Sequence, residues 1–323
     1  AASDVYKRQG VDFALFRHRL SGTIEYYNKY SVDLLAAING SPTQGFGYTT
    51  LMTNNGKMVN RGVEITLSGE IIRQKDFSWN ASLLYAFNRN KVKHISVQPS
   101  LWDSRISMPT SYPMVGKPLY GIYAYKWAGL NENGDPQVYD AENNVTSGPA
   151  RDYHALVYCG TTVPIHNASL TNVLRYKGFE FSAMLILDAG HKLRSSNIPS
   201  INMSNGRITS TAKGIVDRWT QPGDVTDVPR LLFSNDTENF NTHRTELYRY
   251  SDLFVYDASN IRLSNISLAY RVPAHWCKKI SLSGARLQFN VENVATFAFD
   301  SKANYDLGGK VKPNYVWGLY LNF

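Results

Sequence analysis

The sequence lacks the long apolar runs that mark membrane-spanning helices. No stretch of its 323 residues approaches the ~18 consecutive apolar residues that such a helix needs. This absence does not exclude a membrane barrel, whose strands cross with about ten alternating residues. Charged residues are also scarce, at 19%, whereas aromatic residues reach 13% with 21 Tyr. Many aromatic side chains with few charges favour β-strands and interfaces over exposed helices.

Cysteine is nearly absent, and the two present, Cys159 and Cys277, fall in different predicted loops. Neither has a partner at metal-ligand spacing, so we predict no metal site and favour two unpaired thiols over a disulfide. The seven histidines are scattered, and the sequence contains no HExxH, G-x-S-x-G or P-loop motif. We therefore predict no enzyme activity and no cofactor. Three acidic residues predicted on inward strand faces are interpreted as tuning solvation rather than catalysis: Asp12, Glu64 and Glu70.

Clustered positive charge is missing as well. The formal net charge is +8, but lysine and arginine are spread singly along the chain, so we expect no nucleic-acid partner. No signal peptide is visible. Residues 1–9 show no pattern continuous with the residues after them and resemble a translated cloning tail, so we exclude them from the fold prediction. A strand pattern begins at Gly10, and we infer that residues 10–323 are a fragment of something longer.

What the sequence does contain is alternation with a period of two, most clearly in its last ten residues. The apolar positions of this stretch are Tyr315, Trp317, Leu319, Leu321 and Phe323. An aromatic end on the apolar face suits an outer-membrane barrel, whose rim carries an aromatic girdle. Such a terminal strand also resembles the signal read by the barrel-assembly machinery. Simple packing in the girdle is the alternative, and both can be true.

Four hairpins are predicted before this last strand. They pair residues 11–15 with 20–27, 63–71 with 77–87, 168–176 with 179–187, and 261–272 with 285–294. The longer strands, at about 11 residues, exceed the ~5–6 typical of soluble sheets and fit a membrane wall. On the last return strand a continuous polar face is formed by Arg286, Gln288, Asn290 and Glu292. Such a face is typical of a wet lumen rather than of a packed core.

The connections between these strands alternate short and long. Long segments with loop chemistry run over residues 34–55, 91–166 and 190–250. Outer-membrane barrels have short periplasmic turns and long outer loops, so the fold class predicted is all-β, an antiparallel transmembrane β-barrel segment. Phe323 should then reach the periplasmic rim, and residues 120–127 should belong to an outer loop or pair with an unrecognised strand. We count about nine wall strands, an odd number that indicates part of a larger barrel.

Several motifs, taken in order along the chain, resemble a known family. Residues 54–64, Asn-Asn-Gly-Lys-Met-Val-Asn-Arg-Gly-Val-Glu, resemble the N-G-x-x-x-N-x-G-x-E signature of SusC/RagA-type TonB-dependent outer-membrane transporters. Further matches lie at residues 77–79, 88–92, 115–118, 129–130, 133–136, 218–224, 228–230, 257–263 and 266–270. Their order and spacing cover essentially all of residues 10–323. They align with the C-terminal portion of such transporters only.

The resemblance implies a barrel of about 22 strands plugged by an N-terminal domain, of which this chain supplies roughly nine strands and no plug. It implies localisation in the cell outer membrane, among its lipids. It also implies energised import of oligosaccharides or peptides, driven by the TonB complex through the missing plug, with a SusD-like lipoprotein over the outer mouth. The TonB-contacting segment lies in the absent part, so no coupling residue is assigned.

Two features of the predicted loops are candidate ligand contacts. Aromatic rings that could stack on sugars are Trp102, Tyr112, Tyr120, Tyr123, Tyr125 and Trp127. The alternative for these rings is loop packing or the interfacial belt. A second motif could contact ligand or lid and comprises Arg218, Trp219, Pro222, Gly223 and Asp224. We favour the alternative that it folds the loop, with Pro-Gly setting a turn and Asp224 accepting backbone N–H groups.

An interpretation from another class is a secreted, soluble β-sandwich adhesin or carbohydrate-binding module. A sandwich packs the apolar faces of two sheets together, whereas a barrel wall turns its apolar face outward and its polar face inward. A structural outer-membrane barrel without transport is a second alternative. If the chain is part of a barrel, this fragment alone should leave two strand edges unpaired and aggregate without detergent.

Overall fold

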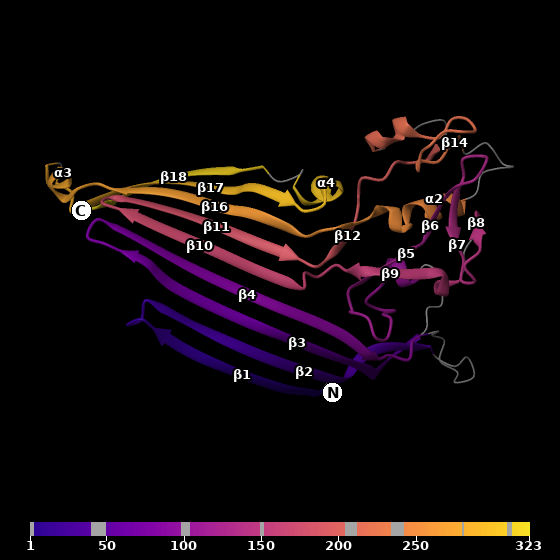
Figure 1. Cartoon of the computed structure of the whole chain (residues 1–323), viewed down its shortest axis with the longest axis horizontal. Helices are drawn as coiled ribbons and strands as arrows, with labels where there is room; N and C mark the ends of the chain where they lie inside the picture. Colours follow the sequence, from indigo (N-terminus) through magenta and orange to yellow (C-terminus); the bar gives the residue numbers. More distant parts are fainter. Residues whose placement is uncertain are drawn as a thin grey trace.

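The computed structural model describes residues 3–39, 50–97, 104–148, 152–203, 212–233, 242–279, 281–308 and 312–323. Its main feature is one nine-stranded antiparallel sheet, hereafter the wall, in the order β1-β2-β3-β4-β10-β11-β16-β17-β18 (Figure 1). The strands are β1 Ser3–Leu15, β2 Leu20–Asn39, β3 Thr50–Arg73, β4 Phe77–His94, β10 His166–Tyr176, β11 Phe179–Ala189, β16 Asn260–Arg271, β17 Gly284–Ala298 and β18 Asn314–Asn322. The predicted four hairpins and final strand are confirmed.

Several strand boundaries differ from the prediction, most of all in β1, β2 and β3. β1 begins at Ser3 and pairs with β2 along its whole length, so the predicted start at Gly10 is wrong. That residues 1–9 are a non-native tail stays a prediction. β2 runs to Asn39 and β3 begins at Thr50, so both strands continue into the segment 34–55 that was predicted as loop. Bulges near Leu34 let the ladder continue through this less regular sequence. Residues 40–49 lie outside the described ranges.

The short connections and the C-terminus lie at one end of the wall, and the long connections lie at the other (Figure 1). Short turns join β1 to β2, β3 to β4 and β10 to β11. The connection from β16 to β17 is longer and contains α3, Ala274–Lys278. This arrangement confirms the predicted asymmetry of the connections and places Phe323 at the end that carries the short turns.

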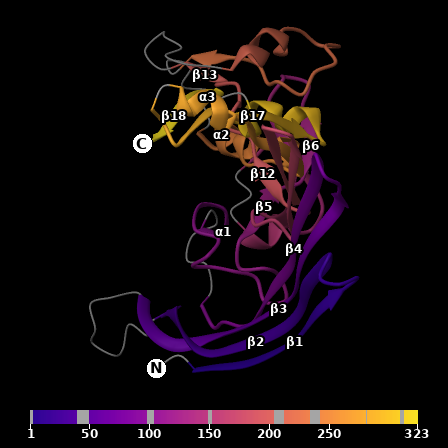
Figure 2. The same cartoon turned by 90° about the vertical axis from the view of Figure 1, so that its left-hand side faces the viewer.

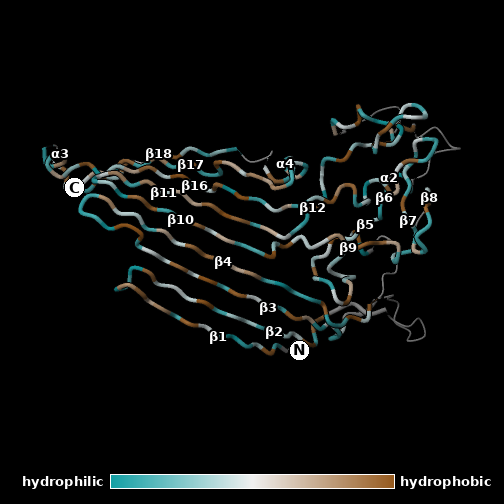
Figure 3. Tube along the Cα trace, in the orientation of Figure 1, coloured by the Kyte–Doolittle hydropathy of each residue, from teal (hydrophilic) through white to brown (hydrophobic). Residues whose placement is uncertain are grey.

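The two faces of the wall have different chemistry, and hydropathy alternates along its strands (Figure 3). Because side chains alternate, residues paired across the sheet share a face. One row in the middle of the wall consists of Leu67, Leu83, Leu170 and Leu185, and the row on the opposite face consists of Ser68, Ser82, Thr171 and Met184. Among the described residues no second sheet covers the apolar face. The β-sandwich alternative is therefore wrong.

The wall is curved and open. In the view of Figure 2, β1–β4 and β16–β18 form opposite sides of an arc, and α1, Ser104–Ser107, lies on its inner side. β1 is paired only with β2, and β18 only with β17, so both edges of the sheet as described are free. The wall is therefore part of a barrel rather than a closed one. Among the described residues, no helix is long and apolar enough to cross a membrane.

The compact core of the chain lies beyond the wall, in the long connections. These fold into small elements, hereafter the loop assembly: β5 Gly121–Tyr125, β6 Trp127–Leu130, β7 Pro136–Tyr139, β8 Val145–Thr146, β9 Leu156–Thr161, β12 Lys192–Arg194, β13 Asn202–Met203, β14 Leu232–Phe233, α2 Thr242–Arg249 and β15 Val255–Asp257. Four 3-10 helices span Tyr153–Ala155, Lys213–Asp217, Asp252–Phe254 and Ser301–Ala303, and α4 spans Asn304–Leu307. The segment predicted at 120–127 belongs here, since β5 pairs with β9 outside the wall.

Candidate functional site

The loop assembly is the candidate functional site because it stands at the end of the wall away from the short turns. Its centre is an aromatic and aliphatic cluster in which Tyr123 and Tyr125 are 1% and 0% exposed. Val138 and Leu156 come from neighbouring strands, and Leu247 comes from α2. Burial of this kind holds loops from three parts of the sequence in one arrangement.

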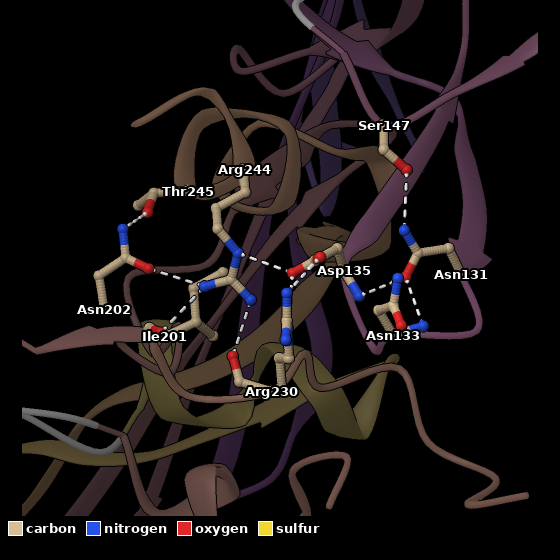
Figure 4. Close-up of polar contacts among 9 residues, drawn as sticks. All are labelled: Asn131, Asn133, Asp135, Ser147, Ile201, Asn202, Arg230, Arg244 and Thr245. Carbon is tan, nitrogen blue, oxygen red and sulfur yellow. Dashed lines mark hydrogen bonds and ion pairs between the residues drawn. The ribbon is translucent and has the colours of Figure 1, made fainter. Parts of the chain in front are cut away.

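A partly buried ion network joins these loops around Asp135 (Figure 4). Arg230 donates to both carboxylate oxygens, at 3.1 and 2.8 Å, and Arg244 Nε donates to Oδ1 at 3.1 Å. The other nitrogens of Arg244 donate to the Ile201 carbonyl at 3.1 Å, to Asn202 Oδ1 at 2.7 Å and to the Arg230 carbonyl at 2.7 Å. Every nitrogen of this guanidinium thus donates a hydrogen bond, which offsets the cost of burying it.

The electrostatics of the network follow from burial. Arg244 is only 2% exposed, and this burial lowers the pKa of its guanidinium, while the Asp135 carboxylate opposes the shift. Burial also raises the pKa of Tyr248, which packs in the second small core with Ile201 and Phe254.

A tight turn after β6 positions Asp135 in this network. Asn131 Oδ1 accepts hydrogen bonds from the amides of Asn133 and Asp135, both at 2.9 Å. Gly134 has a φ of 74°, which side chains other than glycine rarely adopt. The ring of Trp219 packs directly against the place where a Cβ of Gly134 would stand. The Asn133-Gly134-Asp135-Pro136 motif therefore brings two distant loops into contact.

Two further arginines form contacts between loops. Arg194 Nη2 donates to the Tyr123 carbonyl at 2.6 Å, and Nη1 lies 3.3 Å from the carbonyls of Arg249 and Ser251. Arg105 lies over the rings of Tyr123 and Tyr153, at 5.8 and 4.9 Å from their centroids. These contacts fix the loop assembly as one body rather than as independent loops.

The six predicted aromatic residues separate into different environments. Tyr112, Tyr123 and Tyr125 are buried and present no ring face to a ligand in this structure, which is the loop-packing alternative. Trp127 is half-buried, with its indole N–H donating to Asp227 Oδ1 at 3.0 Å. Tyr120 is 46% exposed and keeps an accessible ring. Trp102 lies outside the described residues.

The Arg218–Asp224 motif has the contacts of a folded turn. Asp224 Oδ2 accepts hydrogen bonds from the Thr220 amide and hydroxyl, both at 2.8 Å, and from the Gln221 amide at 3.0 Å. These hydrogen bonds, led by the Thr220 amide, lower the pKa of the Asp224 carboxyl. Gly223 has a φ of 98°, as a turn after Pro222 requires. The contacts are those of the loop-folding role that we favoured, and ligand or lid contact stays a prediction.

The final strand presents its apolar side chains on the exposed face of the wall. Its predicted signal residues are Tyr315, Trp317, Leu319, Leu321 and Phe323, with Trp317 78% and Phe323 92% exposed. The Trp317 ring packs on Phe289 of β17, with centroids 4.2 Å apart. This is packing typical of an aromatic girdle, and recognition by the barrel-assembly machinery stays a prediction.

A cavity of about 410 Å³ opens where the ends of β2, β3 and β4 meet residues 110–119. Its apolar lining includes Leu34, Met58 and Leu119, and His94 and Lys57 supply polar groups. It could accept part of a ligand at the rim of the wall. Among the described residues, no cluster of His, Cys, Asp or Glu could hold a metal ion.

Sequence reasoning missed the residues that organise the site. Asp135 and Arg230 stood in two separate matched motifs, but nothing in their spacing indicates that they pair across 95 residues. Arg244, Arg194 and Arg105 stand in no motif. In the sequence, these three residues appear only as arginines within loops rich in aromatic residues. That pattern is too common to identify them as residues that organise a site.

The wall and loop assembly together define a segment of a membrane β-barrel with a folded cap at one rim. Comparison with known proteins identifies its kind. The family model for the TonB dependent receptor-like β-barrel matches residues 9–294, and the chain belongs to this family. The match agrees with the motifs, whose resemblance was to SusC/RagA-type members of the TonB-dependent group.

Individual relatives agree with this assignment. TonB-dependent receptor P3 of Formosa agariphila is 26% identical over 96% of this chain and 31% of its own length. TonB-dependent receptor SusC of Bacteroides thetaiotaomicron is 24% identical over 88% of this chain and 27% of its own length. A structure of the RagAB peptide transporter has a TM-score of 0.75 at 22% identity, covering all of this chain and 35% of that one. The chain thus spans about a third of the length of these relatives, which are receptors and transporters.

Proposed function

We propose that residues 10–323 form the C-terminal part of an outer-membrane transporter that imports oligosaccharides. In this proposal the TonB complex supplies the energy through a plug domain encoded outside this chain. A SusD-like lipoprotein covers the outer mouth, and the wall faces outer-membrane lipids. The short turns lie in the periplasm and the loop assembly lies outside the cell.

The main support for the proposal is that the two faces of the wall differ in polarity and that its two ends differ in the length of their connections. Its apolar face is exposed along nine strands, its polar face lines the concave side, and its long loops gather at one end. An open, apolar outward face is stable next to lipid and unstable in water. The folded loops then stand where an incoming solute would first meet the protein.

The inward face supports passage of a polar solute. This face carries ion-paired and hydrogen-bonded polar side chains rather than a packed apolar layer. Examples are the ion pairs of Glu180 with Arg175 and Arg286, at 2.7 and 3.1 Å, and the hydrogen bond from Asn167 to Asp188 at 2.6 Å. Such a surface solvates sugars and peptides without offering a tight site for a small ion.

Peptides are the second candidate substrate. The support is that the fold resembles that of the RagAB peptide transporter. At 22% sequence identity, this likeness indicates a similar fold but not a shared substrate. The exposed ring of Tyr120 suits a sugar through stacking, and it suits an aromatic or proline side chain of a peptide equally well.

The test is uptake by cells that carry the full-length gene. We would delete this gene and measure uptake of fluorescent oligosaccharides and of fluorescent peptides, with and without an active TonB protein. We expect that deletion abolishes uptake of one oligosaccharide class and that TonB inactivation does the same. A matched strain carries the full-length protein with Tyr120→Ala, for which we expect weaker uptake and unchanged protein level.

Three outcomes would decide against parts of the proposal. Uptake of peptides alone would reject the oligosaccharide substrate and leave the transporter. Uptake that continues without TonB would reject energised import. Unchanged uptake of every solute, with the protein present in the outer membrane, would favour a structural barrel.

A further inference from the structure

The wall contains two pairs of arginines that stand directly opposite each other on neighbouring strands. Arg271 of β16 pairs with Arg286 of β17, and Arg61 of β3 pairs with Arg89 of β4. Like charges in this position repel each other and destabilise a sheet unless a counter-charge lies between them. The two pairs lie on opposite faces of the wall and differ in how this repulsion is relieved.

One member of the first pair, Arg286, has a counter-charge from within the chain. Arg286 lies on the polar, inward face, which it shares with Glu180, whose row pairs with Gln288 rather than with Arg286. Glu180 Oε1 is 3.1 Å from Arg286 Nη2, and Glu180 Oε2 is 2.7 Å from Arg175 Nε. A single carboxylate therefore bridges Arg286 and Arg175, so Arg286 has an anionic partner on its own face of the wall.

The second pair has no such counter-charge. Arg61 has the same strand parity as Val63, and Arg89 has that of Phe87, so both stand on the apolar, outward face. Among the described residues, no carboxylate lies within ion-pair distance of Arg61, Arg89 or Lys91. Arg61 Nε has only the neutral Asn28 Oδ1, at 3.2 Å. All three cations are exposed.

Lys91 adds a third charge to the same spot. It stands on β4 two residues beyond Arg89, on the same face, which places it roughly 7 Å further along the strand. Three cations without a carboxylate partner in the described part of the chain thus form a triangle on two adjacent strands. Neither strand is an edge there, because β3 is flanked by β2, and β4 by residues 116–117, whose backbone hydrogen-bonds to Val92. The missing part of the barrel therefore does not extend the sheet next to them.

The height of the triangle on the wall indicates what covers it. The next row toward the short turns on the same face is apolar and aromatic, with Tyr26, Val63 and Phe87 paired across β2, β3 and β4. Beyond the triangle, β4 continues to His94 and the paired strands β2 and β3 continue to Asn39 and Thr50, toward the end of the wall that carries the long connections (Figure 1). The cations therefore lie just above an aromatic belt, the level at which lipid headgroups replace lipid tails.

We propose that Arg61, Arg89 and Lys91 bind a phosphate group on the headgroup of a lipid in the leaflet next to the loop assembly. The inference rests on the proposed placement of the wall in the outer membrane. Two guanidinium groups side by side match the oxygens of one phosphate, and the lysine adds a flexible third donor. The bound phosphate converts the repulsion between the arginines into attraction to a shared anion, as Glu180 does for the inward cluster.

The experiment uses the full-length protein purified in mild detergent. The probe is the phosphorylated glycolipid of the outer leaflet, added in a titration and counted on the protein by native mass spectrometry. The test variant is R61Q/R89Q/K91Q. The matched control is K75Q/K278Q/K279Q, which removes the same charge from exposed lysines of the short connections at the other end. Dephosphorylated glycolipid and inorganic phosphate serve as the other two probes.

We expect the test variant to bind the phosphorylated lipid about tenfold or more weakly, and the control to bind it as the parent does. Removing one cation should cost about fivefold, equivalent to about 1 kcal/mol. Dephosphorylated lipid should bind the parent as weakly as phosphorylated lipid binds the test variant.

Several results would overturn the proposal. These are unchanged lipid binding by the test variant, equal binding of dephosphorylated lipid, and binding of inorganic phosphate as strong as that of the lipid. Loss of a co-purifying lipoprotein from the variant, with lipid binding intact, would assign the triangle to a protein partner instead. Each result is measured on the purified barrel, so it is separate from the uptake assay that tests the proposed function.

Discussion

The wall exposes its large apolar side chains, whereas the loop assembly buries its own. Val11, Leu287 and Trp317 are exposed on one face of the wall, while Tyr123 and Leu247 are buried in the loop assembly. The wall is held by long ladders of backbone hydrogen bonds between adjacent strands. The loop assembly is held by a small core and by arginines that donate to carbonyls and to the partly buried carboxylate of Asp135.

In the placement that we propose, two solvents therefore act on one chain. The loop assembly follows the rule of soluble proteins, with apolar groups inside and with every nitrogen of the buried Arg244 guanidinium hydrogen-bonded. The wall follows the rule of the bilayer, where backbone groups are satisfied by neighbouring strands and apolar groups point outward. Each region should therefore respond to a different kind of substitution.

The strongest response should come from Arg244→Met in the full-length protein. The change removes the side-chain donor to the Arg230 carbonyl, one of two donors to the Ile201 carbonyl and one of the two cations at Asp135. Breaking such a buried pair costs about 3–5 kcal/mol. We expect faster amide hydrogen exchange over residues 131–139 and 242–249, with exchange in the wall unchanged.

Arg249→Met on the same helix is the matched control, because Arg249 is exposed. It should change local stability by less than about 1 kcal/mol. Equal exchange in the two variants would show that the Asp135 network does not hold the loop assembly together.

A second pair of substitutions tests the wall instead. Leu170 and Thr171 are neighbours in the middle of β10 that point to opposite faces. Leu170→Arg places a charge against lipid and should destabilise the full-length barrel by about 2–4 kcal/mol, whereas Thr171→Arg faces the polar side and should cost much less. Denaturant unfolding in lipid vesicles measures both. A larger loss for Thr171→Arg would mean that the faces are assigned the wrong way round.

Lowering the pH should have the smallest effect on the stability of the loop assembly. Burial alone raises the pKa of Asp257, but hydrogen bonds from Ser259 and Lys192 outweigh it and lower the value to about 2. Because the folded pKa lies below the ordinary 3.8, the stabilisation is present above about pH 4 and is lost as pH falls toward 2. The pair is exposed, so we expect less than about 1 kcal/mol.

Protease resistance of the loop assembly in the full-length protein checks this pH dependence. It should weaken between pH 4 and 2 in the parent and should change less in Asp257→Asn over the same range. An identical pH profile in the two proteins would show that ionised Asp257 does not stabilise the loop assembly.

Much of the wall could be predicted from the sequence, because alternation with a period of two is a local signal. Residues 63–71 and 77–87, for example, indicate their faces and their turn without reference to the rest of the chain. The ends of the strands were less predictable. β1 from Ser3 and β2 to Asn39 continue through residues without clean alternation, since pairing with a neighbour needs only backbone groups.

The candidate site could hardly be predicted at all. The contact between Asp135 and Arg244 joins residues 109 positions apart and depends on how several loops pack. The sequence around Tyr123 suits a ligand-stacking ring and a core ring equally well, and only burial separates these roles. The outward pair of Arg61 and Arg89 likewise requires the register of β3 against β4, which no single strand reveals.

One face of the wall should meet lipid, and the other should meet a polar interior. Nitroxide labels on single cysteines at positions 287, 288, 289, 290 and 291 of β17 test this arrangement, in the full-length protein in vesicles with Cys159 and Cys277 replaced by alanine. We predict that positions 287, 289 and 291 collide with dissolved oxygen and avoid a water-soluble nickel complex, whereas 288 and 290 do not show this lipid signature. Collision rates without a period of two, or with the two sets exchanged, would contradict the placement of the wall in a membrane.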